Sequence, residues 1–407
     1  MTLPSNLCLA PFTYMTFDPA TNVSPCPALG GSVWNFKGQS FNQIWTNQQL
    51  TDFRAKMLNN EKHDVCQRCW NEEKVGMASE RTMLWNPASD PTGSKTYILN
   101  TAKTAADVLD TEHYLKGPMQ IVIKVGNVCN LRCRSCNSGD SITLAVEGKY
   151  YAETYGLTDN FYLKDTETKV FTDFQIEEIA NFCTNVKRIE FYGGEPLLDK
   201  QLPKFLRMLV DRGLASSIQL NISTNITHQL SDELIDTLSN FEHLNISLSI
   251  DGWGDKFTYI RHPGKWDEVY ENIKKFISLR DSGRINMSLL PAITVTSLNV
   301  YYLPELITNL KEHFNLPVFL ILAWYPFYYS IKNIPEDVSA NIIAKLQNFK
   351  LHDLSPIVEA LKYPADLKEW DNFKMWTKIL DEYRGESFSD TFKEYADVIK
   401  LHDHQER

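Results

Sequence analysis

Residues 119–324 alternate between two patterns of hydrophobic and polar positions. Short apolar segments rich in β-branched residues end at turn-forming residues, as buried β-strands do. The segments between them carry apolar residues three and four positions apart, which is the pattern of an amphipathic helix. The predicted strands cover residues 119–125, 188–192, 217–223, 244–250, 287–295 and 318–324, and the predicted helices cover residues 202–211, 232–241, 266–279 and 303–314.

Strands that alternate with helices predict an α/β fold with a parallel sheet built from βα units. Six strands are too few for a closed barrel of eight, so we expect a partial (β/α)6 barrel. The flanking segments differ from this region. Residues 8–26 have the pattern of a β-hairpin around a Pro/Asn turn, and residues 41–54 have that of an amphipathic helical stretch. Towards the other end, six apolar residues share one helical stripe, which predicts a helix packed on the barrel: Leu367, Trp370, Phe373, Trp376, Leu380 and Tyr383.

These patterns divide the chain into four expected parts. A small α+β unit covers about residues 1–85, a linker covers residues 86–117, the barrel covers residues 118–330, and a helical C-terminal extension covers residues 331–407.

Composition and charge restrict the classes of partner. The chain has 407 residues, of which 43% are hydrophobic and 23% charged, as in an ordinary globular protein with a sizeable core. Its net charge is −10, and the 41 Lys and Arg residues are dispersed without a basic run. We therefore expect neither nucleic acid nor an anionic membrane as the main partner. A cationic or neutral substrate would approach more easily.

The compartment is predicted from what the chain lacks. The first residues show no charged segment followed by an apolar stretch, and nowhere do about 18 apolar residues run together, so we expect neither a signal peptide nor a transmembrane helix. A cytoplasmic location follows from this. In a reducing compartment the eight cysteines are expected to be metal ligands or buried thiols rather than disulfides.

Three cysteines, Cys129, Cys133 and Cys136, directly follow the first predicted barrel strand. Their loop emerges from the carboxyl end of a strand, where α/β enzymes place their chemistry. Three thiolates on one short loop can hold three irons of a four-iron cluster and leave the fourth iron open. A zinc site is the alternative, but three cysteines without a nearby fourth Cys or His make a poor closed tetrahedral site.

The Cys-x3-Cys-x2-Cys spacing after the first strand of a partial barrel resembles the radical S-adenosylmethionine (SAM) superfamily. The resemblance implies a 4Fe-4S cluster whose open iron binds SAM, and an external one-electron reductant such as flavodoxin or ferredoxin. Reductive cleavage of SAM would then form a 5′-deoxyadenosyl radical that removes a substrate hydrogen. The chain departs from the family at Ser135, where an aromatic residue that touches the adenine is usual.

Further polar motifs follow successive strands and resemble the SAM-binding motifs of that family. The Gly-Gly-Glu-Pro run after the second strand matches the GGEP motif, whose glycines let backbone carbonyls approach a ligand ammonium. The third strand is followed by a segment like the one that bonds the methionine and ribose of the cofactor, and the fourth by Ser-x-Asp-Gly and an arginine. Ordinary strand-end turns and a solvated arginine are the alternative. The predicted cofactor-binding residues are Gly193, Gly194, Glu195, Pro196, Ser223, Asn225, Ser249, Asp251 and Arg261.

Four more cysteines lie ahead of the barrel: Cys8, Cys26, Cys66 and Cys69. A hairpin with two cysteines, an Ile-Trp helix and then Cys-x2-Cys resembles the auxiliary-cluster domains called twitch or SPASM, which usually follow the barrel. The resemblance implies a second 4Fe-4S cluster, and a structural zinc ion with four thiolate ligands is the alternative. A cluster with four protein ligands has no iron free for substrate, so its expected role is electron relay.

The eighth cysteine and the substrate are less constrained. Cys183 ends a helical stripe and is expected in the core, with a hydrogen-donating thiol as the alternative. The 324–329 segment follows the sixth strand, where a substrate pocket and core packing are both open. Family resemblance favours a peptide or protein side chain as substrate over a small molecule. From a different class, the chain could be a non-catalytic zinc-binding adaptor, but the strand-end motifs would then have no role.

Overall fold

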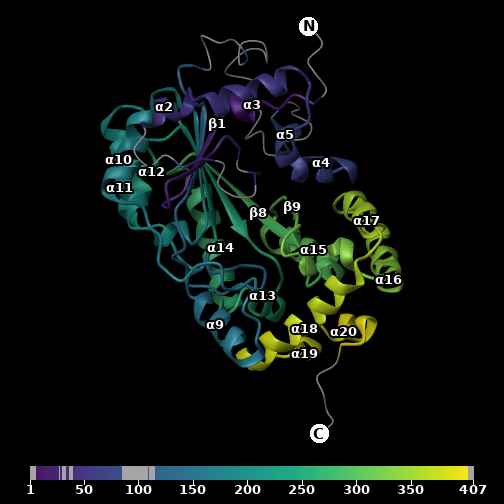
Figure 1. The fold of residues 1–407 in the computed structure, drawn as a ribbon. Coiled ribbons are helices and arrows are strands. Elements are labelled where there is room, and N and C mark those ends of the chain that lie inside the picture. Colours follow the sequence, from purple (N-terminus) through teal and green to yellow (C-terminus); the bar gives the residue numbers. More distant parts are fainter. Residues whose placement is uncertain are drawn as a thin grey trace.

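The computed structural model describes residues 6–26, 28, 29, 34, 35, 40–84, 109 and 115–401. One mixed sheet runs through these residues, with the strand order β3-β2-β1-β4-β5-β6-β7-β8-β9 (Figure 1). Strands β4 to β9 lie side by side in chain order and are all parallel, as predicted for the partial barrel. Their bounds are β4 Gln120–Lys124, β5 Arg188–Tyr192, β6 Gln219–Thr224, β7 His243–Ser249, β8 Met287–Val295 and β9 Phe319–Leu322.

Helices connect the successive parallel strands and cover the outer face of the sheet (Figure 1). They are α10 (Asp173–Phe182), α11 (Gln201–Asp211), α12 (Asp232–Leu238), α13 (Asp255–Ile260), α14 (Trp266–Asp281) and α15 (Leu303–Phe314). Strand β8 shows how the faces are divided, because its residues alternate strictly between buried and half-buried. Met287, Leu289 and Ile293 are buried, whereas Leu290 and Ala292 line a cavity on the opposite face.

The N-terminal hairpin extends the same sheet. Strand β1 (Tyr14–Phe17) pairs in parallel with β4, from Tyr14 opposite Gln120 to Phe17 opposite Ile123, and β2 (Asn22–Ser24) pairs with β1 in antiparallel register. Strand β3 (Trp34–Asn35) pairs with β2. The predicted hairpin is therefore present but shorter than residues 8–26, because residues before β1 form the short helix α1 (Ala10–Thr13).

Helices of the N-terminal part pack beside this hairpin. The predicted helical stretch 41–54 is in fact two helices, α2 (Phe41–Trp45) and α3 (Gln48–Leu58). They separate at Asn47, whose side chain accepts a hydrogen bond from the backbone N–H of Leu50 and so caps α3. Two more helices follow, α4 (Gln67–Lys74) and α5 (Glu80–Met83). The predicted linker 86–117 lies almost entirely outside the described residues.

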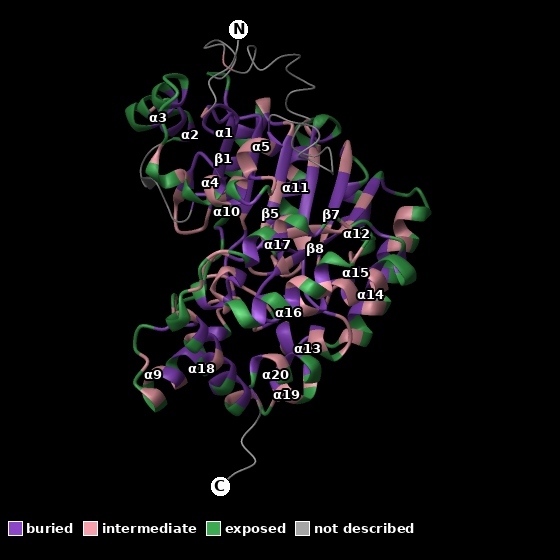
Figure 2. Ribbon diagram, turned by 90° about the vertical axis from the view of Figure 1, so that its right-hand side faces the viewer, coloured by how far each residue is buried: buried purple, intermediate pink, exposed green. Residues whose placement is uncertain are grey.

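The C-terminal extension is helical, as predicted, and comprises α16 (Glu336–Gln347), α17 (Ser355–Leu361), α18 (Leu367–Arg384), α19 (Phe388–Thr391) and α20 (Lys393–Ile399). Figure 2 shows α18 beside α9 (Leu144–Tyr155), away from the N-terminal part. The ring of Trp376 lies 5.6 Å from that of Tyr151 and 5.2 Å from that of Tyr162. The predicted apolar stripe is buried over most of its length, but Leu367 is 61% exposed because it is the first residue of α18. Among the described residues, no helix combines the length and apolar character that a membrane span requires.

Candidate functional site

A cavity of 590 Å³ lies at the carboxyl ends of the parallel strands. All three cysteines of the loop after β4 line it, together with strand-end residues of β5, β6 and β7. The predicted residues that line it are Cys129, Cys133, Cys136, Gly193, Gly194, Glu195, Ser223, Asn225, Ser249 and Arg261. The structure thus brings together residues from segments that are far apart in sequence. Of the predicted residues, Pro196 and Asp251 are not part of this lining.

The two glycines after β5 are required by a close backbone approach. Gly193 and Gly194 have φ angles of +77° and +47°. A Cβ atom on Gly194 would lie 2.6 Å from the carbonyl oxygen of Val128, next to the first loop cysteine. The backbone N–H of Glu195 donates to the same carbonyl at 2.8 Å. This turn therefore packs directly against the cysteine loop, which only glycine permits.

Glu195 lines the cavity, but protein donors already bind its carboxylate. One oxygen accepts from the backbone N–H of Asn225 at 2.7 Å, and the other accepts from the hydroxyl of Thr224 at 2.8 Å and the backbone N–H of Leu197 at 3.0 Å. The residue is 1% exposed, and this burial raises the pKa of the carboxyl. Glu195 therefore ties the end of β5 to the end of β6.

Asn225 lies next to the cysteine loop. Its amide nitrogen donates to the side-chain oxygen of Asn130 at 2.9 Å and lies 3.8 Å from the sulfur of Cys129. Its own side-chain oxygen accepts from Thr227 at 2.6 Å. The amide is thus oriented between the loop and the cavity.

Arg261 and Asp251 form a buried ion pair beside Cys133. The guanidinium lies 2.7 Å from the carboxylate of Asp251 and 4.0 Å from the sulfur of Cys133, and its Nε has no hydrogen-bond partner among the described residues. Asp251 is 2% exposed and also accepts from the backbone N–H of Thr294 at 2.8 Å. Asp251 therefore orients Arg261 from the side that faces away from the cavity, and Arg261 rather than Asp251 lines the cavity.

The three loop thiols fit a group that brings its own positive charge. Burial raises the pKa of Cys129 to about 12, and it raises the pKa values of Cys133 and Cys136 as well. Burial disfavours the thiolate form of these side chains, and binding of a cation would favour it. No other Cys or His belongs to the described lining, so the donor set is three sulfurs. This set fits a four-iron cluster with one iron left to a small ligand.

The four N-terminal cysteines meet at a second cavity, which Cys8, Cys26, Cys66 and Cys69 all line. Burial raises the pKa of Cys66 to about 11, and burial together with the neighbouring thiols raises the pKa values of Cys8 and Cys26. Four thiols that line one cavity match in number the ligands of a four-iron cluster or of a zinc ion. Within the described ranges, no three His, Cys, Asp or Glu side chains are grouped closely enough to hold a single metal ion.

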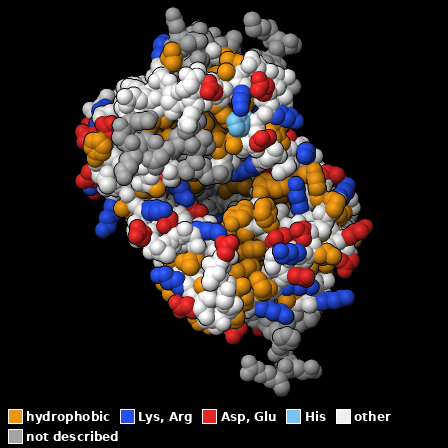
Figure 3. All heavy atoms as spheres, in the orientation of Figure 1, with side chains coloured by type: hydrophobic (Ala, Val, Ile, Leu, Met, Phe, Trp, Pro, Cys, Tyr) orange, Lys and Arg blue, Asp and Glu red, His pale blue; other side chains and the backbone are white. Residues whose placement is uncertain are grey.

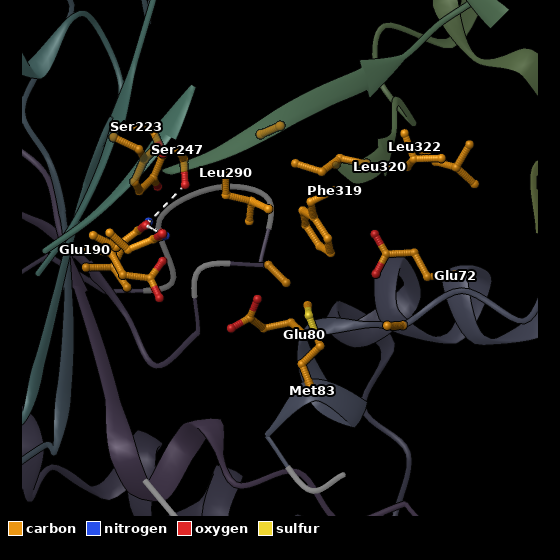
Figure 4. Close-up of a pocket in the computed structure, with 18 of the residues that line it drawn as sticks. Glu72, Glu80, Met83, Glu190, Ser223, Ser247, Leu290, Phe319, Leu320 and Leu322 are labelled. Carbon is orange, nitrogen blue, oxygen red and sulfur yellow. Dashed lines mark hydrogen bonds between the residues drawn. The ribbon is translucent and has the colours of Figure 1, made fainter. Parts of the chain in front are cut away.

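A third cavity of 300 Å³ joins the other two, since Ala28 and Arg68 line all three. Figure 4 shows Glu72 and Glu80 on the helices of the N-terminal part facing Glu190 and Leu290 on the sheet. Glu72 accepts from the indole N–H of Trp324 at 3.3 Å, which connects α4 to the segment after β9.

The sequence patterns did not predict this third cavity. One signal was available in Glu190, which together with Arg188 places charge within a predicted strand. Its carboxylate lies 3.0 Å from the guanidinium of Arg188 on the same strand. Asn221 and Asn245, also within predicted strands, line the same cavity.

Cys183 lies away from these cavities. It follows the last residue of α10, is 1% exposed, and its thiol donates to the carbonyl oxygen of Ile179 at 3.1 Å. This position favours the core interpretation over the hydrogen-donor alternative.

Two family models match the sequence. The model described as Radical SAM superfamily matches residues 123–299, and the SPASM model, described as an iron-sulfur cluster-binding domain, matches residues 8–70. No curated protein matches the chain.

Solved structures that resemble the chain do so at low identity. Streptococcus suis SuiB bound to precursor peptide SuiA is 13% identical, with 83% of this chain and 66% of that chain covered and a TM-score of 0.36. The protein anSMEcpe with bound AdoMet is 20% identical, with coverages of 57% and 60% and a TM-score of 0.38. The methyltransferase TsrM from Kitasatospora setae is 13% identical, with coverages of 54% and 39% and a TM-score of 0.35. The chain therefore spans less than two thirds of each of these proteins.

Proposed function

We propose that this chain, which matches the Radical SAM superfamily model over residues 123–299 and the SPASM model over residues 8–70, is a radical SAM enzyme. In this proposal it uses a 5′-deoxyadenosyl radical to take a hydrogen atom from a peptide or protein side chain. Its cofactors are a 4Fe-4S cluster, SAM and an auxiliary iron-sulfur group. One observation carries the proposal. Three loop thiols share a single cavity with the glycine turn after β5, with Asn225 and with Arg261.

In this proposal different residues around the cavity bind different parts of the two cofactors. Cys129, Cys133 and Cys136 would hold the cluster, which with SAM supplies the radical when both are bound. The backbone of Gly193 and Gly194 would approach the amino group of SAM, and Arg261 would meet its carboxylate or ribose. Burial around them would keep water away from a reactive intermediate.

Other cavity residues would assist. Ser223, Asn225 and Ser249 line the cavity and offer hydrogen bonds to the polar parts of SAM. Glu195 and Asp251 would act as positioning residues, since their carboxylates already bind the protein. Pro196 begins the short 3₁₀ turn Pro196–Leu198 and would set the direction of the chain after the glycine turn.

The peptide substrate is supported by the rim of the main cavity. Tyr325 lines that cavity and is 56% exposed, and the ring of Phe327, which is 59% exposed, lies 5.6 Å from it. Figure 3 shows hydrophobic side chains gathering across the middle of this face, between the N-terminal helices and the C-terminal extension. Exposed aromatic side chains at a cavity mouth suit an apolar segment of a peptide.

A small-molecule substrate is favoured by a different observation. Residues of α4 and α5 line the third cavity on one side, and its charged lining residues are three glutamates, Glu72, Glu80 and Glu190, and two arginines, Arg68 and Arg188. A small cationic molecule would fit such a lining. Comparing peptides with small amines as substrates of the reconstituted enzyme separates the two candidates.

For the auxiliary group we propose electron relay, with flavodoxin or ferredoxin as the external reductant of the enzyme. The relay is supported by Ala28 and Arg68, which line both cysteine cavities and so place the two sites next to each other.

The proposed function is tested on protein reconstituted with iron and sulfide without oxygen. With dithionite as reductant, the enzyme should convert SAM to 5′-deoxyadenosine, and Cys133→Ala should abolish this conversion because the cluster loses one of three ligands. Cys183→Ala is the matched control, since it also removes one thiol but outside the cavities, and it should retain the conversion. Full 5′-deoxyadenosine production by Cys133→Ala would contradict the proposal.

A further inference from the structure

Two arginines lie between the cysteines of the loop after β4, and one of them is completely buried. Arg134 is 0% exposed, and its guanidinium lies 2.5 Å from the carboxylates of both Asp381 and Glu386. Its Nε donates to the carbonyl oxygen of Tyr259 at 3.1 Å, and the guanidinium stacks on the ring of the same tyrosine at 3.5 Å. A side chain of the cysteine loop is thus held by residues about 250 positions further along the chain.

The second arginine makes an equivalent connection. Arg132 lies 3.0 Å from the carboxylate of Glu147 on α9, and Arg384 at the end of α18 lies 2.7 Å from the same carboxylate. Arg384 also donates to the backbone carbonyl of Arg132 at 2.8 Å. Both the side chain and the backbone of the loop are therefore tied to α18.

The same carboxylates also hold the segment that presents Arg261. Tyr259 donates its hydroxyl to Asp381 at 2.7 Å, and His262 lies 2.6 Å from Glu386. In turn, the backbone N–H groups of Arg132 and Arg134 donate to the carbonyl oxygens of His262 and Ile260 at 2.6 and 2.9 Å. The cysteine loop and the Arg261 segment are thus hydrogen-bonded to each other, and both bind the carboxylates of Asp381 and Glu386.

The charges of this network balance. Three guanidinium groups, those of Arg132, Arg134 and Arg384, face three carboxylates, those of Glu147, Asp381 and Glu386. Most of these groups are buried, so removal of one carboxylate leaves the network with one excess positive charge. The loop can keep this conformation at low free energy only while residues 381–386 are docked. We call residues 381–386 the C-terminal clamp.

We propose that the C-terminal clamp is a positioning device for the cysteine loop, which holds the three thiols and Arg261 in register before any cluster binds. The clamp belongs to the extension that follows the 123–299 match, so the motifs of the barrel do not include it. This proposal rests on the proposed function only in taking the loop as the binding site of a cluster.

Hydrogen exchange of the full-length protein without cluster tests the clamp directly, because the amides of Arg132 and Arg134 report the loop conformation. In Asp381→Asn and in Glu386→Gln these two amides should exchange at least about tenfold faster than in the unmodified protein. Asp371→Asn is the matched control, since it makes the same change at an exposed position of the same helix and should leave them protected. Unchanged loop exchange in both clamp variants would overturn the proposal.

A second measurement separates positioning from general destabilisation. In reconstituted protein, Asp381→Asn should raise the reduction potential of the barrel cluster, because the network around Arg134 then carries one excess positive charge, which favours the reduced, more negative cluster. A purely structural role would lower the melting temperature and leave the potential of the folded fraction unchanged, and that result would also overturn the proposal.

A charge-free variant keeps the test decisive if single variants fold poorly. Arg134→Met with Asp381→Asn and Glu386→Gln removes the charges of Arg134 and its two partners together, so its stability should recover relative to the single variants. Its loop amides should still exchange fast, because the ion pairs that connect Arg134 to residues 381–386 are absent. Protected amides in this variant would contradict the clamp. Since exchange is measured without cluster or SAM, failure of the enzyme to cleave SAM would count against the proposed function alone.

Discussion

The carboxylates of Glu195 and Asp251, which the motifs predict to be cofactor-binding, already bind donors of the protein itself. Glu195 receives hydrogen bonds from three protein donors, and Asp251 holds Arg261 and a backbone N–H group. Buried carboxylates need such partners, because an unpaired buried charge is costly. At the residue scale, the motifs selected residues that lie in or beside one cavity, and the hydrogen bonds show which protein groups each carboxylate already binds.

Glu195→Gln tests the brace. The amide keeps the volume but loses the charge that accepts from Asn225, so Asn225 should lose its orientation and SAM should bind about tenfold more weakly. Iron content should stay unchanged, because no cysteine is affected. Isothermal titration with SAM under anaerobic conditions measures the affinity. Equal affinity in the variant would show that Glu195 stabilises the turn without affecting SAM binding.

Gly194→Ala tests the close approach of the glycine turn to the cysteine loop. The added Cβ would collide with the carbonyl of Val128 and is disfavoured by the positive φ, so the loop must move. We expect loss of cluster iron together with at least about tenfold weaker SAM binding. Gly213→Ala is the control, since Gly213 has a φ of +69° but no neighbouring atom within 4 Å of the position that a Cβ would take. Iron analysis and SAM titration of both variants decide the matter.

At the scale of elements, the N-terminal hairpin shares its hydrogen bonds and its core with the barrel. Strand β1 adds to the sheet beside β4, and the ring of Phe17 packs 4.8 Å from Phe41 of α2 and 6.5 Å from Phe182 of α10. Hairpin, N-terminal helix and barrel helix thus meet at one buried side chain. We infer that these parts unfold together.

Phe17→Ala tests this shared core. Removal of a fully buried ring should lower the free energy of unfolding by about 3–5 kcal/mol, and the protein without metal should still unfold in a single transition. Phe174→Ala removes the same ring from a position of α10 that is 71% exposed, and it should change stability little. Urea denaturation followed by fluorescence and circular dichroism would contradict the inference if two separate transitions appeared.

At the scale of the whole molecule, the sheet brings two groups of cysteines to neighbouring cavities. The hairpin places Cys26 at the edge of the barrel. Arg68, which lies between Cys66 and Cys69 in the sequence, is on α4 and lines both cysteine cavities. An arrangement with both sites at one boundary suits transfer of an electron from a substrate radical to the auxiliary group.

Cys66→Ala combined with Cys69→Ala tests the relay. The double variant should lose about four irons while the barrel cluster still converts SAM to 5′-deoxyadenosine without substrate. Product formation should fall or stop, because a cluster with four protein ligands serves the substrate radical rather than the cleavage of SAM. Iron and sulfide analysis with both activity assays measures this. One zinc ion per chain at this site after reconstitution would refute the relay. The metal site of the N-terminal domain would then have a structural role.

The amino-acid sequence by itself determined the elements and the chemistry-bearing loops. Strands β5 and β8 and helix α15 have the predicted bounds, and the cysteine loop follows its strand as expected, because periodicity and turn residues act over a few neighbouring positions. Only the tertiary structure decided the parallel pairing of β1 with β4, the partners of Glu195, and the contact of Arg134 with Asp381. Those contacts join segments 30 to about 250 residues apart, and local patterns carry no information on which distant segment will supply a buried charge with its partner.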